Sequence, residues 1–417
     1  MFLKLKKVEL YYIVLMGVAL IAGLLRNIVF GKLMTPEEMG YYSIALTIAS
    51  YGMLFQLGVI NGLGRELPFA LGQKKHARAL TIVSESTIVL CLLQGLSVIL
   101  YSIIILNIPF TDDKMRSVFL WGGILSLSTP FIQLIMLRLR SEQRVIAFSV
   151  TQVISSILIL LIGAVAIKYL SYLGAIISII IINFSIYIII SKKYLEPVRY
   201  TISNIKNIKY LIKIGLPLML GSILLNLQMS MDRIFLIKYF SVKEIGIYQV
   251  GIIPLILGTA ASGIVSQYIS PKLLYRFGEG KPLSYVFSRA RLVSFITIAI
   301  MGLFIPFVFF GSKFIIQGWL PKYIGSIELI TVFYIGAIFI SANIIGIVYI
   351  AANKQMIQLY MGIFLVLLSF VSYTVISFYS MPIVWYAYIN TTSQIIYYLL
   401  IFSFCFYIAK NKTITAI

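Results

Sequence analysis

Charged residues are scarce in this chain: 11% of its 417 residues are charged and 60% are hydrophobic. Soluble domains are about a quarter charged, so this composition excludes a chain that covers its surface in water. Stretches such as 157–167, 176–190 and 356–377 carry no charge. A bilayer core of roughly 30 Å needs about 20 apolar residues per helix, and isolated strands leave backbone groups unpaired in lipid. The runs therefore predict transmembrane helices.

Residues that commonly bind metals or carry out chemistry are also few. The two cysteines, Cys91 and Cys405, lie inside apolar runs, and the one histidine, His76, lies in a basic loop. This arrangement argues against a disulfide and against a metal site. The segment Gly278–Lys281 lacks the spacing of a phosphate-binding loop, and no hydrolase elbow, zinc helix or paired carboxylates occur outside the apolar runs. We expect no cofactor and no enzymatic activity.

Twelve apolar segments are long enough to cross a bilayer, which predicts an all-α polytopic membrane protein. The chain begins with Met1–Lys7 and an apolar run that lacks a cleavage site, so we interpret this start as an uncleaved first helix. We expect a six-helix bundle over 1–190, a cytoplasmic linker over 191–213 and a second bundle over 214–417. The predicted spans are 10–31, 40–63, 80–106, 118–137, 146–167, 172–190, 214–239, 245–268, 291–311, 326–351, 356–379 and 382–408.

The net charge of +21 comes from basic loops. In a soluble protein it would suggest a nucleic-acid partner, but here the loops are better explained as topology signals. Of the Lys and Arg residues, 24 fall in one set of alternate loops and eight in the other, and Arg26 and Arg233 fall inside spans. In membrane proteins, the loops that carry more Lys and Arg lie on the cytoplasmic side. We therefore predict that both termini are cytoplasmic and that nucleic acid is not a partner.

The chain contains an internal repeat. A shift of 206 residues lays Leu25–Ser43 on Met231–Gln249 and matches polar, glycine and tyrosine positions. Parallel repeats of this kind occur in transporters that bind substrate between the two halves; the alternative is chance similarity between hydrophobic helices. The matched pairs include Ile28 and Ile234, Lys32 and Lys238, Thr35 and Ser241, Glu38 and Glu244, Gly40 and Gly246, and Tyr42 and Tyr248.

The segment Tyr200–Lys213 has isoleucine or leucine at every third position and lysines beside them. This pattern predicts a basic amphipathic helix on the cytoplasmic leaflet, with membrane lipids as its partners. A linker without any recognition role is the alternative. Farther along, Tyr379, Trp385, Tyr386 and Tyr388 are typical of an aromatic belt at the membrane interface.

Four ionisable residues fall well inside predicted spans: Arg26, Glu85, Asp232 and Arg233. A charge at the bilayer centre costs roughly 2.5–3.5 kcal/mol on insertion scales, so each should face the bundle interior or a wet cavity. Two arginines on a shared cavity would suit an anionic ligand, because guanidinium pairs with phosphate through a planar fork. A structural ion pair between Arg26 and Asp232 is the alternative. The substrate-binding residues that we expect are Arg26, Asn27, Asn226, Ser230 and Arg233.

Three further residues are candidates for coupling or gating: Glu85, Asp232 and Pro217. A carboxylate such as Glu85 could carry a coupling proton, since desolvation favours its neutral form; capping by its serine neighbours or pairing with a loop arginine is equally open. Proline kinks often lie where a transporter helix bends. The prolines inside predicted spans are Pro130, Pro217, Pro254 and Pro306.

With these features in view, the chain resembles the O-antigen type of polysaccharide flippase in the multidrug/oligosaccharidyl-lipid/polysaccharide exporter (MOP) superfamily. The resemblance is strongest over Leu24–Ala45, Asn61–Lys75, Ile212–Ile223 and Met231–Gly251. It implies two six-helix bundles arranged as a V, which move undecaprenyl-pyrophosphate-linked oligosaccharide across the bacterial cytoplasmic (inner) membrane. Arg26 matches a basic position of that family, and Asp232 with Arg233 matches its Asp-Arg pair.

Several alternatives stay open at this point. A drug/cation antiporter of the same superfamily would have acidic residues in its cavity. A lipid II flippase would have more arginines in its cavity and extra terminal helices. A membrane polymerase would need a long outward loop, and a scaffold for glycan assembly would tolerate neutral residues at the arginines. The resemblance implies H+ or Na+ as coupling ion, and polysaccharide polymerase and glycosyltransferases as partners.

Overall fold

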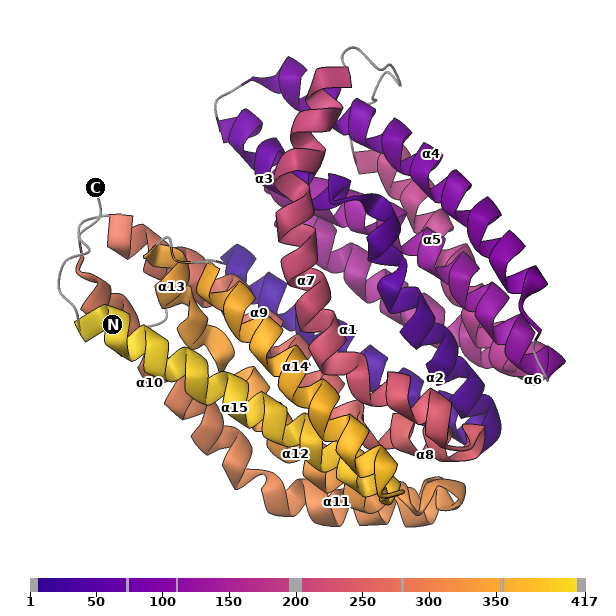
Figure 1. Cartoon of the computed structure of the whole chain (residues 1–417). Coiled ribbons are helices and arrows are strands. Elements are labelled where there is room, and N and C mark those ends of the chain that lie inside the picture. The colour runs from indigo at the N-terminus through magenta and orange to yellow at the C-terminus, as the bar shows by residue number, and fades with distance from the viewer. Residues whose placement is uncertain are drawn as a thin grey trace. The chain divides into compact units, whose positions relative to one another are not determined.

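The computed structural model describes residues 7–72, 75–109, 112–194, 205–278, 281–352, 354 and 356–410, and every regular element in these ranges is a helix (Figure 1). The chain divides into two compact units, Met1–Asn226 and Leu227–Ile417. The boundary between them falls inside one long helix, α7 (Ile205–Tyr239).

Unit 1 is built around helices α1, α5 and α6. Helix α6 packs against both α1 and α5, and α5 also packs against α2 and α4 (Figure 1). The first part of α7 belongs to this unit and buries Leu211 in its apolar core. The elements are α1 (Lys7–Leu33), α2 (Pro36–Ser50), η1 (Tyr51–Gln56), α3 (Val59–Gly72), α4 (His76–Asn107), α5 (Asp113–Ser141) and α6 (Val145–Tyr194).

Helix α6 contains two predicted spans in one element. Its 50 residues would extend roughly 75 Å at 1.5 Å per residue, far more than a bilayer core of about 30 Å. The backbone leaves the helical region at Ser171, with φ 53° and ψ −141°. This break lies between the predicted spans 146–167 and 172–190, so α6 supplies two crossings.

The second predicted span, 40–63, is interrupted in the structure. Helix α2 ends at Ser50, the 3-10 helix η1 follows, and Leu57 and Gly58 adopt positive φ values of 47° and 77° before α3 begins. Glycine is suited to this position because it has no Cβ. The hydropathy pattern does not reveal the interruption, because the broken segment is as apolar as a continuous helix.

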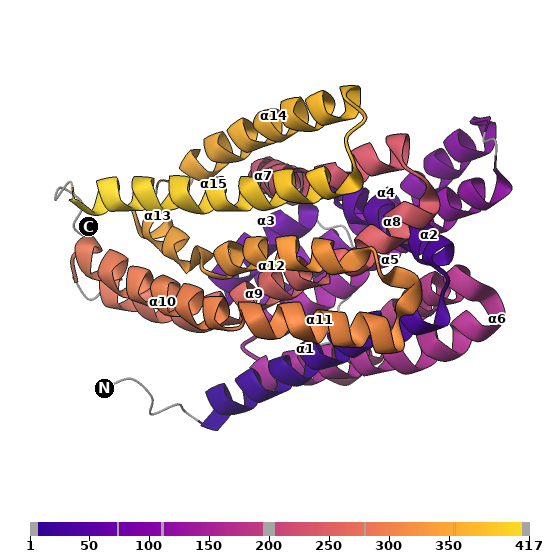
Figure 2. The same ribbon diagram turned by 90° about the horizontal axis from the view of Figure 1, so that it is seen from below.

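Unit 2 is built around α12, whose residues Leu329, Phe333 and Ala337 are fully buried at helical spacing. Helix α12 packs against α9, α15, α8 and α11, and Figure 2 shows it among these helices. The elements are the rest of α7, α8 (Val242–Gly251), α9 (Ile253–Gly278), α10 (Leu283–Leu303), α11 (Ile305–Trp319), η2 (Pro321–Tyr323), α12 (Ser326–Ser341), η3 (Asn343–Gly346), α13 (Ile347–Ala351), α14 (Met356–Phe378) and α15 (Ile383–Lys410).

The described helices account for the predicted spans. Among the described residues, nine helices are long and apolar enough to cross a membrane, or ten when the α8–α9 pair, bent by 42°, counts as one span. The second half of α6 and the interrupted α2–η1–α3 segment complete the twelve. Pro254 and Pro306 follow breaks, near the starts of α9 and α11, whereas Pro130 and Pro217 lie inside α5 and α7.

The outward faces of these helices are apolar. Along α4, Leu92, Leu96, Ile99 and Ile103 recur at helical spacing, and each is more than half exposed. A soluble monomer seldom presents an apolar stripe of this size, whereas lipid tails solvate it. The chain is a multi-pass membrane protein.

The repeat predicted from the sequence reappears in the local structure. Thr35 and Glu38 form a capping box at the start of α2, and Ser241 and Glu244 form the same box at the start of α8. A shift of 206 residues carries the first box onto the second, and it also carries the end of α1 at Leu33 onto the end of α7 at Tyr239. A shared turn with matched helix ends makes chance similarity a poor explanation.

The linker predicted over 191–213 is helical at both described ends. Residues 191–194 continue α6, and Ile205 to Lys213 form the first turns of α7. Residues 195–204 lie outside the described part of the chain, so a surface helix over Tyr200–Lys213 stays a prediction, and so do the domain limits.

Candidate functional site

The repeat places two charged residues at equivalent positions beside equivalent tyrosines. Arg26 on α1 and Asp232 on α7 are 206 residues apart, as are Tyr42 on α2 and Tyr248 on α8. Both tyrosines are almost completely buried. In unit 1 the tyrosine lies within range of the Arg26 charge, and in unit 2 it contacts the Asp232 carboxylate. The two units thus place opposite charges at the same point of the repeat.

Asp232 is at the centre of a buried hydrogen-bond network in unit 2. Its Oδ2 accepts from the Tyr248 hydroxyl at 2.6 Å and from Nδ2 of Asn390 at 2.9 Å, and its Oδ1 accepts from the backbone N–H of Arg233 at 2.7 Å. The residue has no exposed surface. A buried carboxylate requires such donors because it has lost its water. This network gives Asp232 a structural role inside unit 2, and its predicted role in coupling or gating stays a prediction.

Arg233 follows Asp232 and is only partly satisfied by its own unit. Its Nη2 donates to the Met229 carbonyl at 3.3 Å, and its Nε lies 3.8 Å from Oδ1 of Asp232. The side chain keeps 19% of its surface exposed. A guanidinium has five N–H donors, so Arg233 can reach a further acceptor without giving up these contacts.

Arg26 differs from Arg233 in its surroundings. Within the described part of the chain, its Nε is buried and has no hydrogen-bond partner. The next residue, Asn27, is buried and donates its side-chain amide to the Gly23 carbonyl at 3.0 Å, inside the same helix. Arg26 is therefore a partly buried cation whose hydrogen-bonding capacity is incompletely used, and an anion would complete it.

Two of the expected substrate-binding residues on α7, Asn226 and Ser230, lie in different units. Asn226, in unit 1, donates its amide to the Ser50 carbonyl at 3.2 Å, where α2 ends. That carbonyl belongs to the last turn of α2, and the carbonyl groups of a last turn need hydrogen-bond donors from outside the helix. Ser230 is buried in unit 2. Asn226 thus has a local structural contact, and substrate binding by Asn226 and Ser230 stays a prediction.

Two buried glutamates lie in unit 1 near the start of α7. Glu85 on α4 has no exposed surface and accepts from Nδ2 of Asn207 at 3.4 Å. Glu66 on α3 is also buried; the Tyr210 hydroxyl lies 3.5 Å away and Arg78 lies 3.9 Å away. Arg78, one arginine of the predicted basic loop, is thus placed beside Glu66.

The start of α7 crosses α3 at very short range. A Cβ added to Gly215 would lie 1.9 Å from the Gly58 carbonyl oxygen, and one added to Gly62 would lie 2.3 Å from the Leu211 carbonyl oxygen. Small residues permit this approach between membrane helices. Pro217 follows two residues later, inside α7 and exposed. It removes one backbone hydrogen bond next to a fixed crossing, and its predicted gating role stays a prediction.

Sequence reasoning missed several members of these clusters. Glu66 lay beyond the predicted end of the second span, and Asn390 lies on a helix far along the chain from Asp232. One signal was present: residues 390–394, Asn-Thr-Thr-Ser-Gln, form five consecutive polar positions inside an apolar span. Asn390, Ser393 and Gln394 are all buried, and Ser393 accepts from Gln228 of α7.

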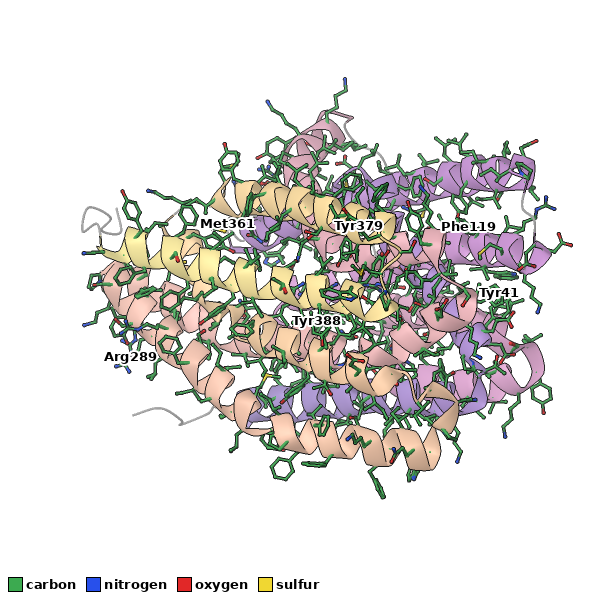
Figure 3. All side chains as sticks on the ribbon, turned by 60° about the horizontal axis from the view of Figure 1, so that its bottom comes forward. Tyr41, Phe119, Arg289, Met361, Tyr379 and Tyr388 are labelled. Atoms are coloured by element: carbon green, nitrogen blue, oxygen red, sulfur yellow. The ribbon has the colours of Figure 1, made fainter. Side chains whose placement is uncertain are left out.

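The aromatic belt prediction was wrong for Tyr386. Tyr379, at the α14–α15 turn, and Tyr388, on α15, are exposed (Figure 3). Tyr386 is buried and stacks on Tyr373 with ring centroids 5.7 Å apart. It faces the other side of α15 because neighbouring helix positions point in different directions. In the described ranges, no three His, Cys, Asp or Glu side chains are placed to hold a metal ion together.

No protein-family model and no curated protein matches this sequence. Solved structures do match: an inward-facing multidrug resistance MATE family transporter of the MOP superfamily is 13% identical, with a TM-score of 0.68 over 96% of this chain and 100% of that one. The lipid II flippase MurJ, in an inward closed conformation, is 15% identical, with a TM-score of 0.68 over 96% of this chain and 90% of that one.

A MOP superfamily transporter from Pyrococcus furiosus, described as having a binding pocket of reverse polarity, is 14% identical, with a TM-score of 0.63 over 96% of both chains. At these identities the likeness shows the fold alone. The all-helical fold predicted from the sequence is confirmed: the chain has the fold of the MOP superfamily transporters.

Proposed function

We propose that this protein is a flippase for undecaprenyl-pyrophosphate-linked oligosaccharide repeat units, such as those of O-antigen or a related surface polysaccharide. It moves them across the bacterial cytoplasmic membrane by alternating access and makes or breaks no covalent bond. The single observation that supports this proposal most is Arg26, a partly buried guanidinium within a membrane helix whose Nε has no partner among the described residues.

The physical reason lies in the pyrophosphate. An anion that leaves water loses its hydration, and a cation with unused N–H donors offsets that loss. The planar fork of arginine pairs two N–H groups with two phosphate oxygens. The prenyl tail is apolar and can remain in lipid. Asn27, Asn226, Ser230 and Arg233 are the other residues that we assign to the substrate.

The driving force is assigned to an ion, H+ or Na+, with Glu85 as the coupling carboxylate. Glu85 is a carboxylate with no exposed surface, placed inside a membrane helix, and its oxygen Oε1 accepts from the Asn207 amide at 3.4 Å. Glycosyltransferases would supply the substrate, and a polysaccharide polymerase would consume it.

A second candidate, a cation-coupled drug antiporter, is favoured by the two buried glutamates of unit 1, Glu66 and Glu85. In that case the acids, and not the arginines, would bind the substrate. A lipid II-type flippase is a third candidate, which the likeness to MurJ supports. Lipid II also carries a pyrophosphate, so Arg26 alone does not separate it from the first proposal.

The experiment that tests the proposal uses Arg26→Ala and Arg26→Lys in the producing bacterium. We expect Arg26→Ala to keep normal membrane abundance, to lower surface glycan at least tenfold and to accumulate lipid-linked repeat units inside the cell. Arg26→Lys should retain partial function, because it keeps the charge but loses the fork. Arg289→Ala, on α10, is the matched control, since it removes an arginine that contacts the Tyr285 ring.

Three outcomes discriminate the alternatives. Normal surface glycan in Arg26→Ala refutes the proposal. Loss of protein in Arg26→Ala, with rescue when Arg26 and Asp232 are exchanged, supports the structural ion pair instead. Drug sensitivity that follows Glu66→Gln and Glu85→Gln, with glycan unchanged, supports the antiporter.

A further inference from the structure

The ends of α3 and α5, the start of α4 and the turn between α5 and α6 line a pocket in unit 1. Its volume is about 420 Å³, and we call it the α5–α6 pocket. One wall is apolar and includes Leu67, Leu71, Leu80 and Val83. The rest of the lining, which we call the polar wall, comprises His76, Arg138, Ser141, Glu142, Gln143 and Arg144. The pocket is separate from Arg26 and from the buried glutamates, and nothing in the proposed transport step uses it.

The turn from α5 to α6 fixes the polar wall. Gln143 has a positive φ of 57°. Its N–H donates to the Arg140 carbonyl at 3.1 Å, and the N–H of Arg144 donates to the Leu139 carbonyl at 2.8 Å. This pair of bonds is the Schellman arrangement, in which glycine usually holds the left-handed position. A glutamine there costs conformational energy, and such strain is often kept where a side chain has to be held in place.

The charges on this wall do not balance. The Glu142 carboxylate lies 3.4 Å from Nη2 of Arg138 with one oxygen and 3.2 Å from Nε of Arg144 with the other. One negative charge therefore orients two guanidinium groups, and the group has a net charge of +1. Arg138 is 5% exposed and Arg144 is 43% exposed. The two guanidiniums are thus arranged as a pair, one deep and one near the opening.

The helix that starts at the pocket adds to this positive potential. Helix α4 begins at His76, and the side chain of its N-cap residue, Lys75, makes no capping hydrogen bond. The first N–H groups of a helix and its dipole favour a nearby negative charge. Both the helix start and the arginine pair lie on the side that the Lys and Arg distribution predicts to be cytoplasmic.

We propose that the α5–α6 pocket binds a phosphate-bearing anion at the cytoplasmic surface. Two arginines bridged by a carboxylate present N–H donors to phosphate oxygens. The apolar wall accommodates a glycerol and the first methylenes of an acyl chain, which makes the phosphodiester head group of an inner-leaflet lipid one source and free phosphate the other. Basic pockets between membrane helices on the cytoplasmic side bind anionic head groups in this way. A volume of 420 Å³ lies within the range of small-molecule sites.

The test measures lipid binding to the purified, detergent-solubilised full-length protein by native mass spectrometry, with the shift of the unfolding temperature as a second readout. The probes are phosphatidylglycerol, phosphatidylcholine as the zwitterionic comparison, and inorganic phosphate. The variants are Arg144→Gln and Glu142→Gln. Arg140→Gln is the matched control, because Arg140 lies on the same turn of the chain but its guanidinium contacts the Phe148 ring at 5.3 Å.

The two pocket variants should change binding in opposite directions. Arg144→Gln should weaken phosphatidylglycerol binding about tenfold, because it removes one of the two donors. Glu142→Gln should strengthen it several-fold, because the competing carboxylate is gone. Arg140→Gln should leave binding unchanged. A purely structural role for the Glu142 bridge would instead make both pocket variants weaken together.

Each further outcome has a definite meaning. The same opposite response with inorganic phosphate, and none with phosphatidylglycerol, supports the proposal with free phosphate as the ligand. Equal binding of phosphatidylcholine and phosphatidylglycerol overturns it, and so does a uniform response of all three variants. Arg138→Gln is not used, because that residue is buried and its loss would endanger folding.

Discussion

The buried network around Asp232 gives the sharpest stability prediction. The Tyr248 hydroxyl donates to a fully buried carboxylate at 2.6 Å. A hydrogen bond to a charged group contributes about 1.5–3 kcal/mol, so Tyr248→Phe should lower the free energy of unfolding by about that amount. Tyr42→Phe, at the equivalent position of the repeat, is the matched control. Its neighbour is the Arg26 cation, which accepts no hydrogen bond, so we expect a loss below about 1 kcal/mol.

A second variant tests the whole network. Asp232→Ala removes the acceptor for Tyr248, Asn390 and the Arg233 N–H together. Breaking a buried, paired charge costs about 3–5 kcal/mol. The assay is unfolding in a mild detergent against increasing SDS, followed by tyrosine and tryptophan fluorescence. Equal losses for Tyr248→Phe and Tyr42→Phe would refute the reasoning, because the carboxylate would then contribute nothing.

Three other predictions concern topology, coupling and pH. In a variant that lacks Cys91 and Cys405, cysteines placed near Asp112 and Lys322 should react with an impermeant outside reagent, whereas those near Lys74 and Lys281 should not. Reaction near Lys74 in intact cells would contradict the cytoplasmic assignment. Glu85→Gln should abolish the dependence of transport on a pH gradient with protein abundance unchanged, and retained dependence would leave Glu85 a structural residue. The Lys114 N–H and the Tyr41 hydroxyl hold the pKa of Asp112 below its ordinary value. The ionised carboxylate therefore stabilises the folded protein above about pH 4, and this stabilisation is lost as the pH falls through the lowered pKa. Asp112→Asn should therefore lower the unfolding temperature at pH 7, with a gap to the parent protein that closes in acid; a constant gap would disprove the assignment.

Hydropathy predicted the helices well because lipid imposes one rule on every crossing. A segment in the bilayer must satisfy its backbone internally, so a long apolar run is a helix. The turn at Thr35–Glu38 was also readable, since a capping box has a short sequence pattern. Its copy at Ser241–Glu244 made the repeat visible.

The features that the sequence did not predict depend mostly on contacts between helices that are distant along the chain. The sequence around Asp232 does not reveal that Asn390, 158 residues later, will donate to it. Likewise, the 3-10 turn over Tyr51–Gln56 leaves no trace in hydropathy. Tyr386 was assigned to the interface because tyrosine is amphipathic, but the ring of Tyr373 and the hydroxyl of Ser377 give it a buried place.

The repeat also distinguishes the two arginines that the sequence treated as a pair. Arg233 lies 3.8 Å from the Asp232 carboxylate, so its charge is largely balanced inside unit 2. Arg26 occupies the position of Asp232 in unit 1, and no salt bridge joins it to an acid in the described part of that unit. We therefore expect Arg233→Ala to leave a buried carboxylate uncompensated and to reduce membrane abundance, whereas Arg26→Ala should reduce transport alone. Abundance and surface glycan measured together separate these effects. Equal abundance in both variants would mean that Asp232 does not need its neighbour, and that Arg233, like Arg26, serves the substrate alone.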